Sequence, residues 1–590
     1  GKAYMSLYLL IVTIVVPDVT IFIYLLSVRD LTSIFEVPYI IYNVQFLSSS
    51  YMKTSLFWTA ATTLLTIGSA SAAVTTSKAD KSASKTRPNI LFCIADDASY
   101  RHFGANGSSW VKTPGFDRVA EAGILFTNCY TPNAKSAPSR SCILTGLYSW
   151  QLGAAGNHTP IFPDDLKVVT EALEENGYQV AFTGKGWGPG DAGVKNGAPR
   201  KLTGTPYLKH KLTPLTTGIN KVDYFRNFQD FLQEKEGNQP WFFWFGCFEP
   251  HRNYEYGSGE RLGGKDKTVI DDLPPFWPDN DVVRTDMLDY AFEVEYYDNL
   301  VNRFLDELEK RGELDNTIII VTSDNGMPFP RSKGNNYEYS NHMPLAVMWK
   351  NGIANPGRKV SDYVSFVDFV PTFLEVSDIG VQQSGLIPPA GKSMVDIFKT
   401  SKAGIVSKDR HYTLLGRERH DYGRPLNQGY PIRSILQNDL LYVTNLKPEL
   451  YPCGNPETGY TDCDGSPTKT EILRMKRSGE NSYYYDITFD FRPEEELYDL
   501  SVDKDCMNNL AGNEKYAKIK KAMRQLLFDE LRAQKDPRLV GDGDTFDRYP
   551  FWKKNSNDFY ERVQSGEIKE PWKMSGFVSP TDFENHPDNK

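Results

Sequence analysis

The sequence has little cysteine and no excess of positive charge. Seven cysteines in 590 residues are too few for a disulfide scaffold, although Cys453 and Cys463 lie near enough in sequence to pair after export. The chain has no CxxC pair, which argues against a structural zinc site. The net charge of −9 argues against nucleic acid as the main partner, because phosphate binding needs a basic face. An anionic substrate would therefore have to meet positive charge that is concentrated in one place.

The order of apolar runs predicts an α/β fold with more than one folded unit. A chain of 590 residues exceeds the size at which a single core stops growing. From residue 87 to about 405, buried-strand runs alternate with helical repeats, which predicts a mostly parallel sheet sandwiched by helices. A hairpin and a helix predict a smaller C-terminal α+β subdomain at residues 406–590. The expected elements are strands at 89–95, 179–184, 240–248 and 316–323, a helix from Thr285 or Asp286 to Gly312, a hairpin at 432–446 and a helix at 515–534.

Two apolar segments precede the large domain. Residues 5–28 are long enough for a membrane span, but a proline and an aspartate stand at their centre. We therefore interpret residues 1–51 as an upstream extension that is absent from the mature protein, with a membrane anchor as the alternative. Residues 52–72 have the basic start, short apolar stretch and small-residue cleavage pattern of a secretory signal peptide, and residues 73–86 form a polar linker. The sequence thus predicts export and no stable membrane span in the mature form.

Oxygen side chains follow two of the expected strands directly. Asp96 and Asp97 come after the first strand, and Asp324 and Asn325 come after the strand at 316–323. In open α/β sheets, function gathers at the carboxyl ends of strands, and a bound cation would relieve the repulsion between neighbouring acids. Four oxygen ligands suit a hard ion such as Ca²⁺ or Mg²⁺. A solvated turn at the first pair and a tight Asx turn at the second are the simpler alternatives.

Residues 136–146, SAPSRSCILTG, are expected to begin a helix at Ser136. A helix N-terminus offers free N–H groups and a partial positive charge, which suit an anion. Arg140 lies one turn after Ser136, so both side chains can face one ligand. Plain capping by Ser136 or Ser139 is the alternative.

Six segments in this order resemble the motifs of the formylglycine-dependent type I sulfatase family. SAPSRSCILTG resembles the family signature in its bacterial serine form, and the two strand-end pairs resemble its metal motifs. Three further segments resemble its cationic motifs, namely FTGKG at 182–186, FEPHRNY at 248–254 and SKGNNYE at 332–338. The resemblance implies an alkaline-phosphatase-like fold and a sulfuric ester hydrolase of the periplasm, or of the surface or surroundings, of a Gram-negative bacterium.

The same resemblance implies a role for each matching residue. Ser136 would be converted to formylglycine by a radical-type maturating enzyme. Arg140 would steady the formylglycine hydrate, and either His251 or Lys333 would protonate the leaving oxygen. The expected sulfate contacts are Lys185, His251 and Lys333, and the expected ligands of Ca²⁺, or alternatively Mg²⁺, are Asp96, Asp97, Asp324 and Asn325.

Two departures from the family pattern concern substrate handling. Trp187 stands where many sulfatases have a histidine, so His158 is a candidate substitute, with an ordinary loop histidine as the alternative. The pattern is closest to heparan N-sulfatase-like glycan sulfatases, but Lys333 stands where the N-sulfatase has arginine, which leaves an O-sulfate open. The charged stretch at 416–431 suggests that Glu418, Arg419 and His420 recognise the sugar, against the alternative of a solvated charge cluster.

Two other function classes fit the same sequence. A phosphatase or phosphonate hydrolase of the same superfamily would use Ser136 directly as nucleophile, but such enzymes generally employ histidine ligands and the metal positions here are all Asp or Asn. A non-catalytic protein that binds sulfated glycans would keep Ser136 unmodified. Oxidation of Ser136 discriminates the sulfatase from both.

Overall fold

The computed structural model describes residues 6–16, 19–29, 38–39 and 87–589. The chain divides into two compact units, Gly1–Ser84 and Lys85–Lys590. In the first unit, β1 (Ser6–Val16) pairs antiparallel with β2 (Val19–Arg29), which pairs with β3 (Pro38–Tyr39), so the described part of the segment 5–28 is strand. Among the described residues, no helix is both long and apolar enough to cross a membrane. The expected signal peptide and the whole linker lie outside the described residues.

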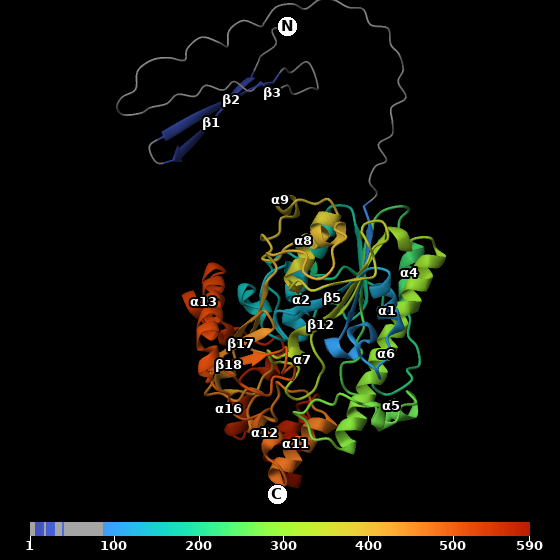
Figure 1. The fold of residues 1–590 in the computed structure, drawn as a ribbon, viewed down its shortest axis with the longest axis vertical. Coiled ribbons are helices and arrows are strands. Elements are labelled where there is room, and N and C mark those ends of the chain that lie inside the picture. Colours follow the sequence, from blue (N-terminus) through green and yellow to red (C-terminus); the bar gives the residue numbers. More distant parts are fainter. Residues whose placement is uncertain (1–5, 17–18, 30–37, 40–86, 590) are drawn as a thin grey trace, which may run out of the picture. The chain divides into compact units, whose positions relative to one another are not determined.

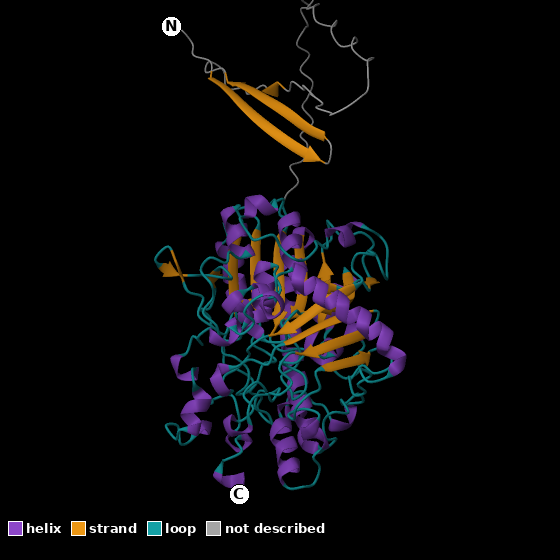
Figure 2. Cartoon of the chain, turned by 90° about the vertical axis from the view of Figure 1, so that its left-hand side faces the viewer, coloured by secondary structure: helices purple, strands orange, loops and turns teal. Residues whose placement is uncertain are grey.

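The second unit is built on a nine-stranded mixed sheet in the order β13-β5-β12-β11-β4-β10-β6-β9, with β14 also paired to β5. The central strands β11, β4, β10, β6 and β9 run parallel, whereas β12 is antiparallel to both of its neighbours. Figure 2 shows these strands side by side with helices around them. Their bounds are β4 Asn89–Ala95, β5 Ile124–Tyr130, β6 Gln179–Gly184, β9 Thr205–Pro206, β10 Trp241–Gly246, β11 Thr317–Ser323, β12 His342–Met348, β13 Arg358–Val360 and β14 Val364–Ser365.

Both faces of this sheet are buried. Along β4, Ile90, Phe92 and Ile94 belong to one hydrophobic core, and the alternating Leu91 and Cys93 belong to a second core. This alternation is what a strand produces when helices cover both faces. Figure 1 places α2 and α8 on one side of β5 and β12, and α1, α4 and α6 on the other. The covering helices are α1 Pro114–Glu121, α2 Ser136–Thr145, α3 Val169–Glu175, α4 Tyr224–Glu234, α6 Asp281–Lys310, α8 Phe369–Val376 and α10 Val395–Lys399.

A separate four-stranded antiparallel sheet follows in the order β15-β16-β17-β18. One face of it packs under α13, since Leu414, Ile435 and Tyr442 share a core with Met523 and Leu527. The elements of this part are β15 Tyr412–Arg417, β16 Ile432–Gln437, β17 Leu440–Asn445, α11 Pro467–Arg477, β18 Glu495–Asp499, α13 Ala517–Ala533, α14 Pro537–Val540, α15 Thr545–Arg548 and α16 Phe559–Gln564. Other short elements are α5 Ser258–Arg261, β7 Val194–Lys195, β8 Ala198–Pro199, α7 Glu338–Asn341, α9 Val381–Ser384 and α12 Tyr483–Asp486.

The α/β class with a mostly parallel central sheet and a C-terminal antiparallel sheet is confirmed. Two local expectations were wrong. The long helix α6 begins at Asp281, capped by the Asn280 side chain, and the expected caps Thr285 and Asp286 are buried inside it. Cys453 and Cys463 are both free thiols. The domain boundary at 405/406 falls between the two sheets and stays a prediction.

Candidate active site

The site residues predicted from the six motifs come together where the parallel strands end. Asp96 follows β4, Lys185 follows β6 and Asp324 follows β11 directly, and His251 lies five residues after β10. The order β11-β4-β10-β6 makes these strands neighbours, so their carboxyl ends meet at one edge of the sheet. Residues separated by more than two hundred positions in the chain thereby reach one site.

Ser136 is the first residue of α2, and its side chain does not cap that helix. Its hydroxyl instead donates to Asp96 Oδ1 at 3.0 Å and lies 3.4 Å from Asn325 Oδ1. Ser139 is equally committed elsewhere, because its hydroxyl donates to the carbonyl of Asp324 at 2.5 Å. The hydroxyl of Ser136 therefore faces both strand-end pairs and does not serve the helix.

Three buried carboxylates crowd the space in front of Ser136. Oxygen atoms of Asp96, Asp97 and Asp324 all lie within 4.8 Å of one another. Asn325 donates its amide to Asp97 Oδ1 at 2.7 Å, which leaves its Oδ1 on the side of Ser136. Asp97 holds a φ of 78°, in the left-handed region that few non-glycine residues adopt and in which aspartate is enriched.

The carboxyls of Asp324 and Asp96 have pKa values that are shifted in opposite directions. Burial and then the charge of Asp96 raise the pKa of Asp324 to about 7. Burial also opposes ionisation of Asp96, but Lys185, His251 and Arg140 outweigh it and hold the pKa of Asp96 well below its usual range. Such crowding is relieved by a cation, and an all-oxygen set of three carboxylates and an amide fits a hard divalent ion such as Ca²⁺.

Two cations close the other side of the cluster. Arg140 is completely buried. It donates from Nε to Asp324 Oδ2 at 2.9 Å and from Nη1 to the carbonyl of Gly186 at 2.8 Å. Lys185 Nζ lies 2.6 Å from Asp96 Oδ2. Since neither side chain can change its position without breaking a buried ion pair, both charges are fixed before any ligand arrives.

Lys333 and His251 carry the remaining predicted positive charge. Lys333 Nζ bridges Asp97 and Asp464, with 2.7 Å to each carboxylate. Burial disfavours its charge, but Asp464 and Asp97 prevail and the pKa of Lys333 is raised. His251 Nδ1 contacts the carbonyl of Arg252 at 2.7 Å, and because a carbonyl only accepts, Nδ1 carries the hydrogen and Nε2 faces Asp97 at 3.8 Å.

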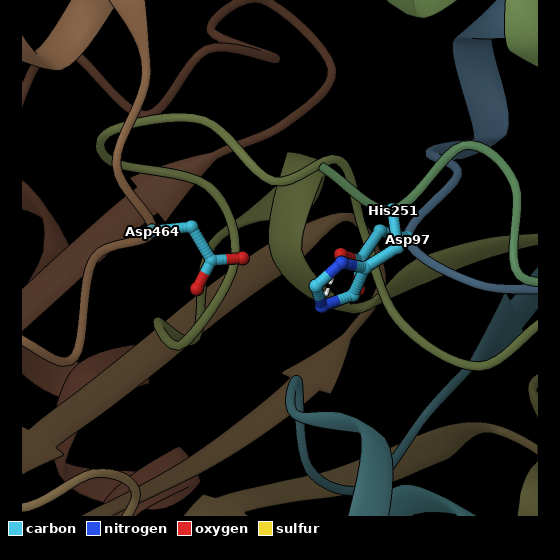
Figure 3. Close-up of side chains that lie close together, drawn as sticks. All are labelled: Asp97, His251 and Asp464. Atoms are coloured by element: carbon cyan, nitrogen blue, oxygen red, sulfur yellow. Dashed lines mark ion pairs between the residues drawn. The ribbon is translucent and has the colours of Figure 1, made fainter. Parts of the chain in front are cut away.

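Asp464 is a member of the site that sequence reasoning missed. Figure 3 shows it opposite His251 and Asp97. The suitable atoms of these three residues lie within 4.8 Å of one another. Asp464 belongs to a loop between β17 and α11, so the C-terminal part of the chain completes the site. No motif surrounds it in the sequence, and nothing short of the fold could have selected it.

Lys135, Asp421 and His158 form a second cluster beside Ser136, and only His158 was predicted from the sequence. Lys135 Nζ lies 2.8 Å from Asp421 Oδ2, and His158 Nδ1 lies 3.1 Å from the other oxygen of that carboxylate. Burial outweighs the pull of Asp421 and lowers the pKa of His158. The structure thus brings the candidate His158 to the site through Asp421. Lys135, directly before Ser136, and Asp421, inside the charged stretch 416–431, could have been selected from these positions.

Many of these groups, among them Ser136, Asp96, Lys185, His251 and Lys333, line one cavity of about 1670 Å³. Trp187 also lines it, and its indole N–H donates to Ser141 Oγ at 2.9 Å. Residues from the C-terminal part of the chain form much of its outer wall, including Tyr422, Trp552, Lys553, Lys554 and Phe577.

Glu418, Arg419 and His420 do not reach this cavity, contrary to the role expected for them. All three side chains are fully buried. Glu418 is paired with Arg433 and Arg538. Arg419 donates to the carbonyls of Asp547 and Tyr549, and His420 Nε2 lies 2.9 Å from Asn133 Oδ1. The charged side chains of this stretch are therefore part of the protein interior. The next two residues, Asp421 and Tyr422, line the cavity.

Comparison with known proteins agrees with this geometry. Residues 88–379 match the family model described as Sulfatase. An ulvan-active sulfatase of Formosa agariphila is 27% identical over 489 residues, covering 78% of this chain and 76% of that protein. The human N-sulphoglucosamine sulphohydrolase is 27% identical over 474 residues, covering 75% and 90% respectively. A solved structure of a protein in complex with its substrate D-glucosamine-2-N,6-O-disulfate shares the fold, with a TM-score of 0.56, 22% identity and coverage of 77% of this chain and all of that one.

The matched region contains every residue that the six sequence motifs placed at the strand ends, from Asp96 to Lys333. Asp421 and Asp464 lie beyond it, in the part of the chain that closes the cavity. Through the domain at residues 88–379, this chain belongs to the sulfatase family and is a sulfuric ester hydrolase.

Proposed function

We propose that the protein hydrolyses a sulfate ester, or an N-sulfate, of a sulfated glycan, using Ser136 after its conversion to formylglycine. The observation that carries this proposal is the position of the Ser136 hydroxyl, 3.0 Å from Asp96 and in front of three crowded carboxylates. An ordinary serine hydroxyl needs a base to act as nucleophile, and no histidine contacts Ser136 in the described chain. Oxidation of this residue would remove that requirement.

Asp96, Asp97, Asp324 and Asn325 are the residues that would hold Ca²⁺, with Mg²⁺ as the alternative. When present, Ca²⁺ would neutralise a sulfate oxygen, and the hydrated formylglycine would supply the attacking hydroxyl. Arg140 would hold that hydroxyl group in place, since its guanidinium is already anchored on Asp324 and on the carbonyl of Gly186. Lys185 and Lys333 would stabilise the charge that grows on the sulfate oxygens, because fixed cations lower a barrier without reorganising.

His251 is the better placed of the two candidate acids for the leaving group. Its side chain is 36% exposed at the cavity, and its Nε2 is free to carry a proton toward a leaving oxygen or nitrogen. Lys333 is buried and shared between Asp97 and Asp464, which favours a permanent charge over proton transfer. We therefore assign proton donation to His251 and sulfate binding to Lys333.

The relatives support a glycan as substrate. The two curated relatives are named for ulvan and for N-sulphoglucosamine, and the similar solved structure holds a glucosamine disulfate. Trp187 on the cavity wall would contact the sugar, and His158 would act beside it through Asp421.

We further propose export to the periplasm, or to the surface or surroundings of the cell, through the signal peptide at 52–72. The catalytic domain would span residues 87–405 and the C-terminal subdomain residues 406–590. A radical-type maturating enzyme would be the partner that oxidises Ser136, because the position holds serine.

Mass spectrometry of the tryptic peptide 136–140 tests the proposal. Protein from the native host, or coexpressed with a radical-type maturating enzyme, is expected to lose two hydrogens at Ser136 and to release sulfate from a sulfated saccharide. Ser136→Ala, produced in the same way, is the control and should release none. An unmodified serine in protein from the native host, without sulfate release from any sulfated sugar, would contradict the proposal. Release of phosphate from a phosphate ester by that unmodified protein would favour the phosphatase alternative.

A further inference from the structure

We infer that the cavity mouth holds a second anion-binding position, which takes the carboxylate or sulfate of the sugar next to the one that carries the hydrolysed sulfate. The position is formed by Lys553 and Lys554 beside Trp552, in a loop of residues 551–557 that we call the rim loop. It deepens the proposed function and rests on it, since it names the class of saccharide that the same cavity would select.

The lysines around Ser136 are already neutralised, and the two lysines of the rim loop are not. Lys185, Lys333 and Lys135 are each paired with a buried carboxylate. Within residues 87–589, which the structure describes, neither Lys553 nor Lys554 is paired with a carboxylate, although both line the cavity. In a chain with a net charge of −9, this leaves local positive charge available to an anion at the mouth.

The acidic neighbours of these lysines are occupied elsewhere. Asp558 accepts a hydrogen bond from the Asn427 amide, and Glu561 accepts one from the backbone N–H of Leu426. Neither carboxylate forms an ion pair with Lys553 or Lys554 in the described part of the chain. Lys553 Nζ instead lies 5.2 Å from the centre of the Trp552 ring, which is itself 39% exposed and lines the cavity. An exposed indole beside unpaired ammonium groups offers an apolar face and a charge to one sugar ring.

The rim loop is held in one conformation before any ligand binds. The Asn557 side chain accepts from the N–H of Phe551 and donates toward the carbonyls of Phe551, Lys553 and Lys554. The N–H of Trp552 donates to the carbonyl of Thr159 at 3.1 Å, which ties the loop to the residue after His158. A loop bound in this way loses little conformational entropy when it engages a ligand.

Arg419 secures the loop from behind. Its guanidinium lies 3.8 Å from the centre of the Phe551 ring and donates to the carbonyl of Tyr549 at 2.6 Å. Arg419, which the sequence suggested as a sugar contact, thus acts indirectly, because it fixes the loop that carries the two lysines.

The cavity is large enough for this arrangement. Its volume of about 1670 Å³ exceeds the roughly 300–1,000 Å³ of ordinary small-molecule pockets. A single sulfated sugar at the strand ends would leave the mouth unfilled, so a second residue of a saccharide can reach the rim loop.

Calorimetric binding to the full chain tests the inference, with Ser136→Ala used throughout to prevent turnover. The probes are three disaccharides of N-sulfated glucosamine whose second sugar is neutral, is a uronate, or carries a sulfate. We expect at least one anionic probe to bind roughly tenfold more tightly than the neutral one at low salt, with the advantage shrinking at high salt. The uronate and sulfate probes identify which anion the position prefers.

Adding Lys553→Ala and Lys554→Ala is expected to abolish this advantage and to leave binding of the neutral disaccharide unchanged. Lys518→Ala with Lys521→Ala is the matched control, since it removes two exposed positive charges of α13, outside the cavity lining, and should keep the advantage. Equal binding of all three probes, or an advantage that survives loss of Lys553 and Lys554, would overturn the inference. Failure of the proposed function is a separate result, namely no sulfate release by the protein with Ser136 intact.

Discussion

Single side chains in this site do two tasks at once, because each cation that would meet sulfate already neutralises an acid. Lys185 is bound to Asp96, and Lys333 is bound to Asp97 and Asp464. Buried charges are tolerated only when they are paired, so this network keeps five charged groups in place without a ligand. Its weak point is Asp324, whose carboxyl is crowded by Asp96.

Metal removal should therefore make stability depend on pH. Without a cation, burial and Asp96 raise the pKa of Asp324 to about 7, whereas an unfolded aspartate has a pKa of about 3.9. The folded metal-free protein then binds the proton more tightly than the unfolded chain does. Its extra stability is complete below the unfolded pKa and is lost as pH rises through about 7. Melting curves between pH 4.5 and pH 8 should show a decline that is larger by a few degrees for chelated protein than for Ca²⁺-saturated protein.

Calcium-saturated protein is the natural control, since it contains the same other carboxyls whose pKa is raised by burial, such as Asp289 and Asp298. Asp324→Asn should remove most of the difference between chelated and Ca²⁺-saturated protein, because an amide has no proton to lose. Parallel pH profiles for chelated and Ca²⁺-saturated protein would show that these carboxylates do not hold the ion.

At the scale of elements, the site depends on how closely two parallel strands end. The N–H of Lys185 donates to the carbonyl of Gly246 at 2.7 Å, and the indole N–H of Trp244 donates to the carbonyl of Lys185 at 3.1 Å. A Cβ atom on Gly246 would lie 1.7 Å from the Lys185 carbonyl oxygen, which is backbone and cannot rotate away. Glycine at 246 thus allows the ends of β6 and β10 to lie close enough to position Lys185 in the site.

Gly246→Ala should accordingly separate the ends of these strands. We expect a loss of about 2–3 kcal/mol in the free energy of unfolding, measured by denaturant titration, because overpacking against backbone cannot be relieved by a rotamer change. Sulfate release should fall with it, since Lys185 moves. Gly512→Ala is the control, as a Cβ there meets nothing within 4 Å, and it should stay within about 0.5 kcal/mol of the unchanged protein. Equal stability of the two variants would refute the close approach.

At the scale of the whole molecule, local sequence predicted the sheet and its strand-end residues but not the closure of the cavity. The apolar composition of runs such as 89–95 and 317–323 predicts strands, and both runs are strands. The residues that directly follow parallel strands lie at the same edge of the sheet, so their proximity could also be predicted. Asp464 joins Lys333 across more than a hundred residues of chain, through a loop with no periodicity. Pairing at that range is decided by packing, which no local pattern contains.

The charged stretch 416–431 also shows what local sequence cannot predict. Its density of charge predicts a ligand site or a solvated cluster equally well, because a sequence does not reveal whether a charge has a partner. Glu418 has two arginine partners in the interior, while Asp421, three residues later, lines the cavity. The difference arises from which face of the chain turns inward after β15.

The buried ion network around Arg433 joins these distant parts, and its loss should loosen the cavity wall. Arg433 is fully buried, pairs with Glu418, lies 2.7 Å from Asp536 and packs over the Trp150 ring. Arg433→Met would leave two carboxylates buried without their main partner, which costs about 3–5 kcal/mol. We expect a lower melting temperature and, in hydrogen exchange followed by mass spectrometry, faster exchange over 546–557, because Glu418 and Arg419 no longer hold that segment.

Arg474→Met is the matched control for this change. Arg474 also pairs with two carboxylates, Glu471 and Glu480, but its side chain is 51% exposed. Exposed pairs of this kind contribute about 0–1 kcal/mol, so its loss should leave both the melting temperature and exchange at 546–557 nearly unchanged. If Arg433→Met behaved like Arg474→Met, the rim loop would owe its position to the Asn557 and Thr159 contacts alone. The two variants remove the same charge and differ in burial. If only Arg433→Met speeds exchange over residues 546–557, the buried charges of the C-terminal part maintain the shape of the cavity mouth.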